Sequence, residues 1–241
     1  MGQKGIKCFT VTKKEGLSLN TLKIYGDSII KGVIYSPTGR KYSLCKEHRV
    51  DKLKCDGWQI TNLAKMGATT RDGLRILEND TTPTDAHTTV LIEFGGNDCA
   101  HDWAQVAAHP NEDHHPAVSP KEFCRNLHTL IQQIRSRTSK ISLVIPPPIH
   151  TQRYFDFICT AADREKILSW LKTPLALYQT QELYSILVRQ VAQEANCPVL
   201  DLRTLFLGAR DVEEYFCLDG CHPNEKGHGM IVEAIKKHVG L

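Results

Sequence analysis

Three side chains in this sequence could together attack a carbonyl carbon: Ser28, Asp219 and His222. Serine is a weak nucleophile until a neighbouring base removes its proton, and that base is usually a histidine oriented by a carboxylate. Asp219 and His222 are three positions apart, a spacing at which two side chains can meet on one side of a turn. Asp219 could then hold one ring nitrogen of His222 while the other ring nitrogen faces Ser28. Pro223 disfavours helical geometry at His222, which predicts that this histidine lies in a loop.

Attack on a carbonyl group also needs hydrogen-bond donors for the negative charge that develops on its oxygen. Asn97 offers a side-chain amide, Gly67 an unobstructed backbone N–H, and Ser28 its own backbone N–H. Donors of this kind each contribute about 3 to 4 kcal/mol when measured by their removal. We therefore expect these three residues to form an oxyanion hole.

Five short apolar runs are candidates for the strands that position these groups. Helix-like segments separate several of the runs, and this alternation is typical of a parallel sheet with helical crossovers. Ser28 directly follows the first run and begins a helix that we expect to include Ile29, Ile30 and Val33, and Asn97 follows the third run. Ligands bind beyond the carboxyl ends of parallel strands, so both residues are expected at one edge of the sheet. The runs are 22–25, 57–63, 89–94, 141–145 and 198–202.

Helical periodicity is clearest in three further segments. Apolar residues recur at helical spacing in 123–134 and 183–191, which predicts two covering helices. A last helix is expected from Pro223, because proline is favoured at the first helical position.

Composition narrows the class of protein. The 241 residues fit a single domain, 1–241, with a formal net charge of +3 and no dense block of basic residues, which argues against nucleic acid as a partner. The first residues show no apolar run typical of a signal peptide, and no stretch approaches the roughly 18 apolar residues that a membrane-spanning helix needs. Nine cysteines without a CxxC pair are expected to be free thiols, Cys217 and Cys221 among them. These features favour a cytoplasmic protein.

The residues that could do chemistry match a known pattern. The sequence resembles the SGNH (GDSL-type) hydrolase family in four blocks that appear in the family's order. The blocks are Gly26-Asp27-Ser28-Ile29, then Asn62 with Ala64, Gly67 and Thr69, then Gly95-Gly96-Asn97-Asp98, then Asp219-Gly220-Cys221-His222-Pro223. The resemblance spans positions 26 to 223. The α/β-hydrolase alternative would require Gly-x-Ser-x-Gly, and no serine in the chain has that frame.

The resemblance implies a flavodoxin-like three-layer α/β/α sandwich around a mainly five-stranded parallel sheet. It also implies hydrolysis of acyl esters through an acyl-enzyme, without a metal or an organic cofactor. Ser28 then resembles the nucleophile and first oxyanion donor, Gly67 and Asn97 the other donors, and Asp219 with His222 the rest of a catalytic triad.

Three segments lie outside this framework: an N-terminal extension, 1–20, and two loop insertions over the active edge, 99–120 and 149–181. Long irregular loops usually have a functional reason, and aromatic residues in them could line an acyl or leaving-group pocket. The irregularly spaced histidines of 101–115 favour a solvated flap over a metal site. Asp98 is expected to support Asn97 at the pocket. The aromatic candidates are Trp103, Tyr154 and Phe155, followed by Phe157 and Trp170.

We therefore expect a small-molecule ester as substrate, with a short acyl group such as acetyl on a sugar or small metabolite. A thioesterase or lysophospholipase would use the same triad but would need a longer apolar groove. An acyltransferase would need a flap that excludes water. A non-catalytic binding module is the alternative from another class, and the intact Ser28, Asn97, Asp219 and His222 argue against it.

Overall fold

The structure is a computed structural model that describes residues 20–36, 38, 40–53 and 57–241. Apart from Asn20, the expected N-terminal extension lies outside the described residues. The central sheet has five parallel strands in the order β4-β1-β5-β6-β7, which confirms the predicted α/β class. Its strands are β1 (Asn20–Gly26), β4 (Trp58–Asn62), β5 (Thr88–Glu93), β6 (Ile141–Ile145) and β7 (Val199–Asp201).

Strand side chains alternate between two hydrophobic clusters, one on each face of the sheet. On β1, Tyr25 packs into one cluster and Ile24 into the other; on β5, Ile92 and Leu91 divide in the same way. This alternation follows from the two-residue period of a strand. Because both faces of the sheet are covered, the strands consist mainly of consecutive apolar residues.

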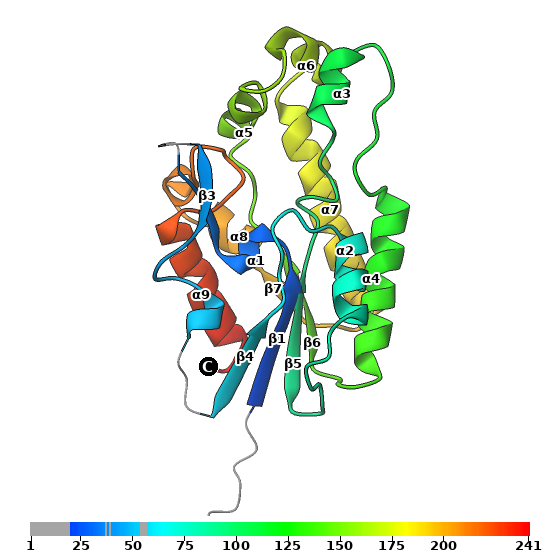
Figure 1. The fold of residues 1–241 in the computed structure, drawn as a ribbon, viewed down its shortest axis with the longest axis vertical. Helices are drawn as coiled ribbons and strands as arrows, with labels where there is room; N and C mark the ends of the chain where they lie inside the picture. The colour runs from blue at the N-terminus through cyan, green and yellow to red at the C-terminus, as the bar shows by residue number, and fades with distance from the viewer. Residues whose placement is uncertain (1–19, 37, 39, 54–56) are drawn as a thin grey trace, which may run out of the picture.

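Helices cover both faces of the sheet and complete three layers (Figure 1). One face packs against α2 (Thr70–Glu78), α4 (Pro120–Arg135) and α7 (Leu175–Glu194). The other face packs against α1 (Ser28–Lys31), α8 (Leu202–Leu207) and α9 (Glu225–Val239). Two short 3-10 helices, Val50–Lys52 and Val212–Tyr215, lie in connecting segments.

Two helix boundaries differ from the prediction. Helix α1 ends after one turn because Gly32 adopts a left-handed conformation (φ 83°), so Val33 begins a strand instead of continuing the helix. Helix α9 begins at Glu225, two residues later than expected. The Asn224 side chain accepts a hydrogen bond from the Gly227 backbone N–H and is therefore the N-cap, which leaves Pro223 in the preceding loop.

The two expected loop insertions both contain helices, although most of 99–120 is irregular. The segment 99–120 contains α3 (Trp103–Ala108), and the segment 149–181 contains α5 (Thr151–Ile158), α6 (Arg164–Leu171) and the beginning of α7. Helices α3, α5 and α6 share a small hydrophobic cluster of their own and lie together beyond the carboxyl ends of the strands (Figure 1). They therefore form one packed cap over this edge.

A β-hairpin at the same edge of the sheet was not predicted from the sequence. Strands β2 (Val33–Ser36) and β3 (Lys41–Leu44) form an antiparallel hairpin directly after α1. None of the helices in the described part of the chain is long and apolar enough to cross a membrane.

Candidate active site

Ser28 lies at the junction of β1 and α1, where the chain turns sharply at the carboxyl edge of the sheet. It is the first residue of α1, and Asp27 caps this helix by accepting a hydrogen bond from the Ile29 N–H at 2.8 Å. The serine is largely buried but lines a cavity. The local sequence thus turns the chain so that the hydroxyl of Ser28 faces a space beyond the strand ends.

His222 reaches the same point from the other end of the chain. Its Nε2 lies 2.8 Å from Ser28 Oγ, and its Nδ1 lies 2.7 Å from Asp219 Oδ2. The other carboxylate oxygen of Asp219 accepts hydrogen bonds from the backbone N–H groups of Cys221 (3.3 Å) and His222 (3.2 Å). These bonds fix the carboxylate, which in turn favours the His222 tautomer that carries its proton on Nδ1. That tautomer leaves Nε2 free to accept the serine proton.

The turn that carries this pair depends on Gly220. Its φ of 73° lies in the left-handed region, and an added Cβ would lie 2.7 Å from the His150 carbonyl oxygen. The Gly220 carbonyl also accepts a hydrogen bond from the His150 N–H at 2.7 Å. The loop of Asp219 and His222 is therefore held against the start of α5, and only glycine fits there.

Two of the three expected oxyanion donors lie at the cavity. Ser28 and Asn97 line it, and Asn97 Nδ2 donates to Asp27 Oδ2 (3.0 Å) and to the Ala68 carbonyl oxygen (3.1 Å). Both amide hydrogens of Asn97 thus have partners in this structure. Gly67 is exposed on the turn before α2, with a φ of 73°, and does not line the cavity.

Three further buried carboxyl groups belong to Asp27, which lines the cavity, and to Glu93 and Asp98, which do not. The Asp27 backbone N–H donates to Glu93 Oε2 at 3.2 Å. Burial raises the pKa of Glu93 well above its usual range, and the neighbouring Asp27 raises it further. Burial also raises the pKa of Asp27, but hydrogen bonds from Ile29 and Asn97 oppose that rise, so we expect Glu93 to hold its proton more firmly than Asp27. The signal for Glu93 in the sequence is an acidic side chain within an otherwise apolar strand.

Asp98 does not line the cavity. Its Oδ1 accepts hydrogen bonds from the Thr70 backbone N–H (2.9 Å) and hydroxyl (2.6 Å), which ties the loop after β5 to the first turn of α2. Burial raises the pKa of Asp98 to about 6. Its side chain therefore holds the loop that carries Asn97 and is not part of the cavity lining.

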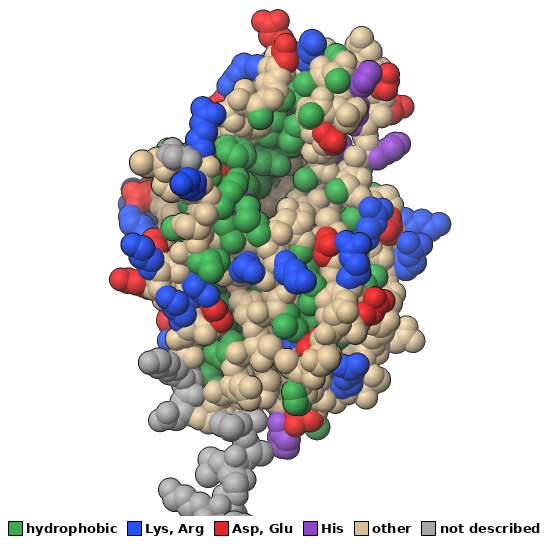
Figure 2. Space-filling view, in the orientation of Figure 1, with side chains coloured by type: hydrophobic (Ala, Val, Ile, Leu, Met, Phe, Trp, Pro, Cys, Tyr) green, Lys and Arg blue, Asp and Glu red, His purple; other side chains and the backbone are tan. Residues whose placement is uncertain are grey.

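The cavity beside Ser28 has a volume of about 110 Å³. Trp103 and Tyr154 line it, as expected, whereas Phe155 is buried in the core of the helical cap with the Arg164 guanidinium over its ring. Figure 2 shows a hollow in the upper half of the molecule with hydrophobic side chains gathered along it. Further lining residues that the sequence analysis did not identify come from the end of β6 and from α6 and α7. They are Pro146, Pro147, Ile149, Leu171 and Leu177.

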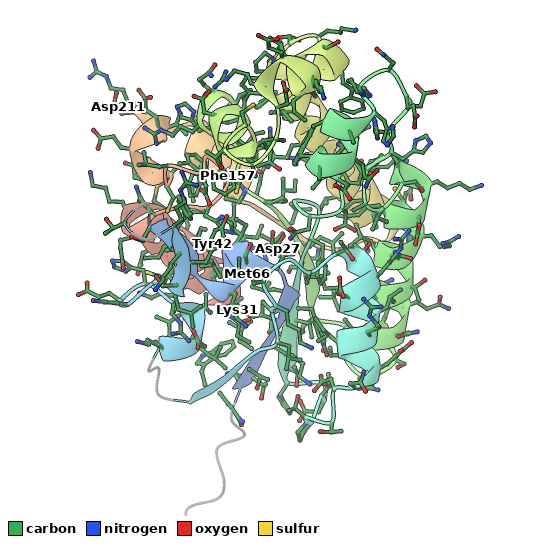
Figure 3. All side chains as sticks on the ribbon, turned by 45° about the horizontal axis from the view of Figure 1, so that its top comes forward. Asp27, Lys31, Tyr42, Met66, Phe157 and Asp211 are labelled. Carbon is green, nitrogen blue, oxygen red and sulfur yellow. The ribbon has the colours of Figure 1, made fainter. Side chains whose placement is uncertain are left out.

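Aromatic rings from the hairpin approach His222 from outside the cavity. The ring of Tyr42 lies 5.2 Å from the imidazole of His222, and Tyr35 lies 5.2 Å from both Tyr42 and Phe157. Figure 3 shows Phe157 above Tyr42 and Asp27 next to it in this view. The pattern of apolar and polar residues in the sequence did not predict this aromatic cluster, because its members come from three separate elements, β2, β3 and α5.

Within the described residues, one group of side chains has atoms close enough to hold a metal ion together: Asp219, Cys221 and His222. All three are already linked by hydrogen bonds, since His222 Nδ1 lies 2.7 Å from Asp219 Oδ2 and 3.3 Å from Cys221 Sγ. Burial and the nearby Asp219 carboxylate raise the pKa of the Cys221 thiol well above its usual range, which makes it a poor metal ligand. The histidines of 101–115 are not part of this group.

Comparison with solved structures places this fold among known hydrolases. The chain superposes on a lipase/acylhydrolase from Enterococcus faecalis with a TM-score of 0.62 and 21% identity, covering 92% of this chain and 95% of that one. It also superposes on Axe2, an acetylxylan esterase from Geobacillus stearothermophilus, with a TM-score of 0.60 and 20% identity over 93% and 95% of the two chains. A third neighbour, LAE5 from the metagenome of Lake Arreo, gives 0.60 and 21% over 93% and 98%. At these identities the likeness concerns the fold.

A search of curated proteins finds no significant match. The model of the GDSL-like lipase/acylhydrolase family, however, matches residues 24–230, which is most of the chain and includes Ser28, Asn97, Asp219 and His222. The chain therefore belongs to the GDSL-like lipase/acylhydrolase family and is an ester-hydrolysing enzyme.

Proposed function

We propose that this protein is a serine esterase in which Ser28 is the nucleophile, His222 the general base and acid, and Asp219 the group that orients the histidine. The observation that carries the proposal is the continuous hydrogen-bonded chain from Ser28 Oγ to His222 Nε2 (2.8 Å) and from His222 Nδ1 to Asp219 Oδ2 (2.7 Å). Both distances lie within the reach that proton transfer requires.

The reaction proceeds in two halves. His222 Nε2 takes the hydroxyl proton as Ser28 Oγ bonds to the ester carbonyl carbon, and Asp219 stabilises the imidazolium that forms. Collapse of the tetrahedral intermediate breaks the bond to the alcohol oxygen, which receives the proton from His222. Water then attacks the acyl-enzyme with His222 again as the base. The bond between Ser28 Oγ and the acyl carbon breaks, His222 returns the proton to Ser28 Oγ, and the carboxylic acid leaves.

We assign the oxyanion hole to the Ser28 backbone N–H and the Asn97 amide, which line the cavity. Gly67 does not line the cavity in this structure, and we propose that its backbone N–H becomes a third donor only when the turn before α2 moves toward bound substrate. Asn97 is held in place by Asp27, which accepts one of its amide hydrogens. The other hydrogen is bound to the Ala68 carbonyl, and we infer that it turns toward the oxyanion when substrate binds. Apo active sites often tighten such contacts only when the substrate is present.

The size of the cavity favours a short acyl group. Pockets for drug-sized ligands usually hold about 300 to 1,000 Å³, whereas the cavity beside Ser28 holds about 110 Å³. An acetyl group or another short acyl chain fits this space, and the long chain of a lysophospholipid does not. The acetylxylan esterase among the structural neighbours agrees with an acetyl ester as substrate.

The alcohol part of the substrate must lie on the side of His222, because His222 delivers the proton to the leaving oxygen. On that side, Tyr42 is 36% exposed and packs against the imidazole, and Tyr35 and Phe157 extend the aromatic surface. Aromatic rings offer a broad apolar face with a polar edge, to which a sugar ring can bind. We therefore propose a sugar or a similar cyclic alcohol as the leaving group.

The seven cysteines of the described part of the chain are free thiols. This supports our placement of the enzyme in a reducing compartment, the cytoplasm.

The test is a panel of p-nitrophenyl esters from acetate to palmitate, with Ser28→Ala as the inactive variant. Loss of a triad member is expected to lower turnover by on the order of 10³-fold or more. Ser136→Ala, which changes an exposed serine at the C-cap of α4, is the matched control. A Ser28→Ala variant with wild-type turnover would refute the proposed nucleophile.

Two further measurements separate the alternatives. A fluorophosphonate should give a single adduct at Ser28 by mass spectrometry, and folded protein without an adduct would favour a binding module. Adding sugar alcohols to the ester assay distinguishes an acyltransferase, which would form a new ester in place of the free acid.

A further inference from the structure

A second hollow lies directly beside the proposed acyl cavity. It is a groove of about 330 Å³ between α6, α7 and the segment 116–120. Three residues line both the groove and the cavity of Ser28: His101, Leu171 and Thr180. The two spaces are therefore neighbours that share one wall.

His101 is fixed in this wall by aromatic contacts. Its ring lies 5.4 Å from the ring of Trp103 and 5.0 Å from that of Trp170. Burial lowers the pKa of His101 to about 4, and the charges of His114 and His115 act in the same direction. The imidazole is thus neutral near pH 7, and a neutral ring can border a hydrocarbon chain without an unpaired charge.

The groove has the chemistry of an acyl site. Pro116, Trp170 and Leu183 contribute apolar surface. The Thr180 hydroxyl donates to the Ala176 carbonyl at 2.9 Å, so this polar group is already paired. A hydrocarbon chain could therefore occupy the groove without leaving that hydroxyl unsatisfied.

We propose that His101 closes the acyl pocket of this enzyme and sets its limit on acyl-chain length. The ring separates a cavity that accepts a short acyl group from a groove that could receive the rest of a medium-length chain. His101 is thus a residue that determines specificity, and its removal joins the two spaces. This inference rests on the proposed esterase function of Ser28.

The experiment compares kcat/KM for p-nitrophenyl octanoate and p-nitrophenyl acetate in the wild type and in His101→Ala. Added methylene groups bound in an apolar pocket change such ratios by about tenfold or more, so we expect the octanoate-to-acetate ratio to rise by about tenfold. His114→Ala is the matched control, because His114 also contacts Trp170 but lines neither space. Its ratio should equal that of the wild type.

Two further variants strengthen the test. Leu171→Ala opens the same wall at another residue and should shift the ratio in the same direction, even if His101→Ala fails to fold. Adding Ala176→Leu to His101→Ala fills the groove from α7 and should cancel the gain for octanoate. Circular dichroism and thermal unfolding verify that each variant is folded.

The outcomes separate this inference from the proposed function. If His101→Ala and Leu171→Ala are folded, hydrolyse the acetate ester and keep the wild-type ratio, the proposal for His101 is overturned and the esterase remains. If the wild type hydrolyses no ester and gives no fluorophosphonate adduct at Ser28, the proposed function fails, and the inference fails with it.

Discussion

Asp219→Asn tests most directly how the carboxylate controls the histidine. The two oxygens of Asp219 have different partners: Oδ2 accepts from His222 Nδ1 at 2.7 Å, and Oδ1 accepts from the backbone N–H groups of Cys221 and His222. An asparagine keeps both backbone bonds only if its oxygen takes the place of Oδ1. Its NH₂ group then faces His222 Nδ1.

That orientation imposes the wrong tautomer. Nδ1 must accept a hydrogen bond from the amide, so the ring proton moves to Nε2, which can no longer take the proton of Ser28. The flipped asparagine would instead point its NH₂ group at two buried N–H donors, at a cost of about 1 to 3 kcal/mol for each unsatisfied group. The inactive arrangement is therefore preferred, and kcat should fall by about 10⁴-fold, which corresponds to about 5 kcal/mol.

The assay is steady-state hydrolysis of p-nitrophenyl acetate, with thermal unfolding to verify the fold. Asp211→Asn is the control for the loss of one carboxylate, because Asp211 is exposed and lies at the outer edge of the molecule in Figure 3. It should retain wild-type turnover. If folded Asp219→Asn keeps more than about a tenth of wild-type kcat, the role given to the carboxylate is wrong.

Three further predictions concern the donor, the buried acid and the turn. Asn97→Ala should lower kcat by about 10²- to 10³-fold with a smaller change in KM, because its amide acts on the transition state; steady-state kinetics that show a change in KM alone would contradict this role. The pKa of the Asp98 carboxyl group is about 6 in the folded state, compared with 3.8 in the unfolded chain. The protonated Asp98 carboxyl group therefore contributes about 3 kcal/mol to the free energy of unfolding below pH 3.8, and this contribution is lost as the pH rises through about 6. The variant Asp98→Asn keeps a side-chain oxygen that can accept from Thr70, but its amide does not titrate. In urea unfolding, the free energy of unfolding of Asp98→Asn should therefore rise by about 3 kcal/mol relative to that of the wild type between pH 4 and 7. A difference that stays constant with pH would show that the pKa of Asp98 is not raised. Gly220→Ala should lower the free energy of unfolding by more than 1 kcal/mol and also reduce turnover, because the added methyl group collides with the backbone of His150 and Tyr154 at a positive φ. An unchanged melting temperature would show that an alanine side chain fits at this position.

The five strands and the main covering helices could be predicted from the sequence because their signals are local. A buried parallel strand is an apolar run ended by turn residues, and each such run forms a strand within a few residues of the expected position. The parallel topology then brings the residues after β1 and β5 to one edge, as predicted for Ser28 and Asn97. Pro223, which disfavours helical geometry at His222, predicted the loop before the last helix in which this histidine lies.

Other features were decided only by contacts between distant segments. Asp98 and Phe155 are next to residues that line the cavity, yet both side chains turn away from it, one toward Thr70 and the other into the helical cap. The hairpin that carries Tyr42 has too few residues in each strand to give a clear alternation. Sequence spacing does not report these directions, because they depend on what packs against each side chain.

The sequence by itself thus determined the kind of chemistry and the sheet that supports it, since both follow from residue types and short-range patterns. Tertiary structure decided the size of the cavity beside Ser28, the wall that it shares with the neighbouring groove at His101, and the burial that raises the pKa of Glu93. Volume and burial arise only when separate segments exclude water from the same space, and no local pattern in the chain records them.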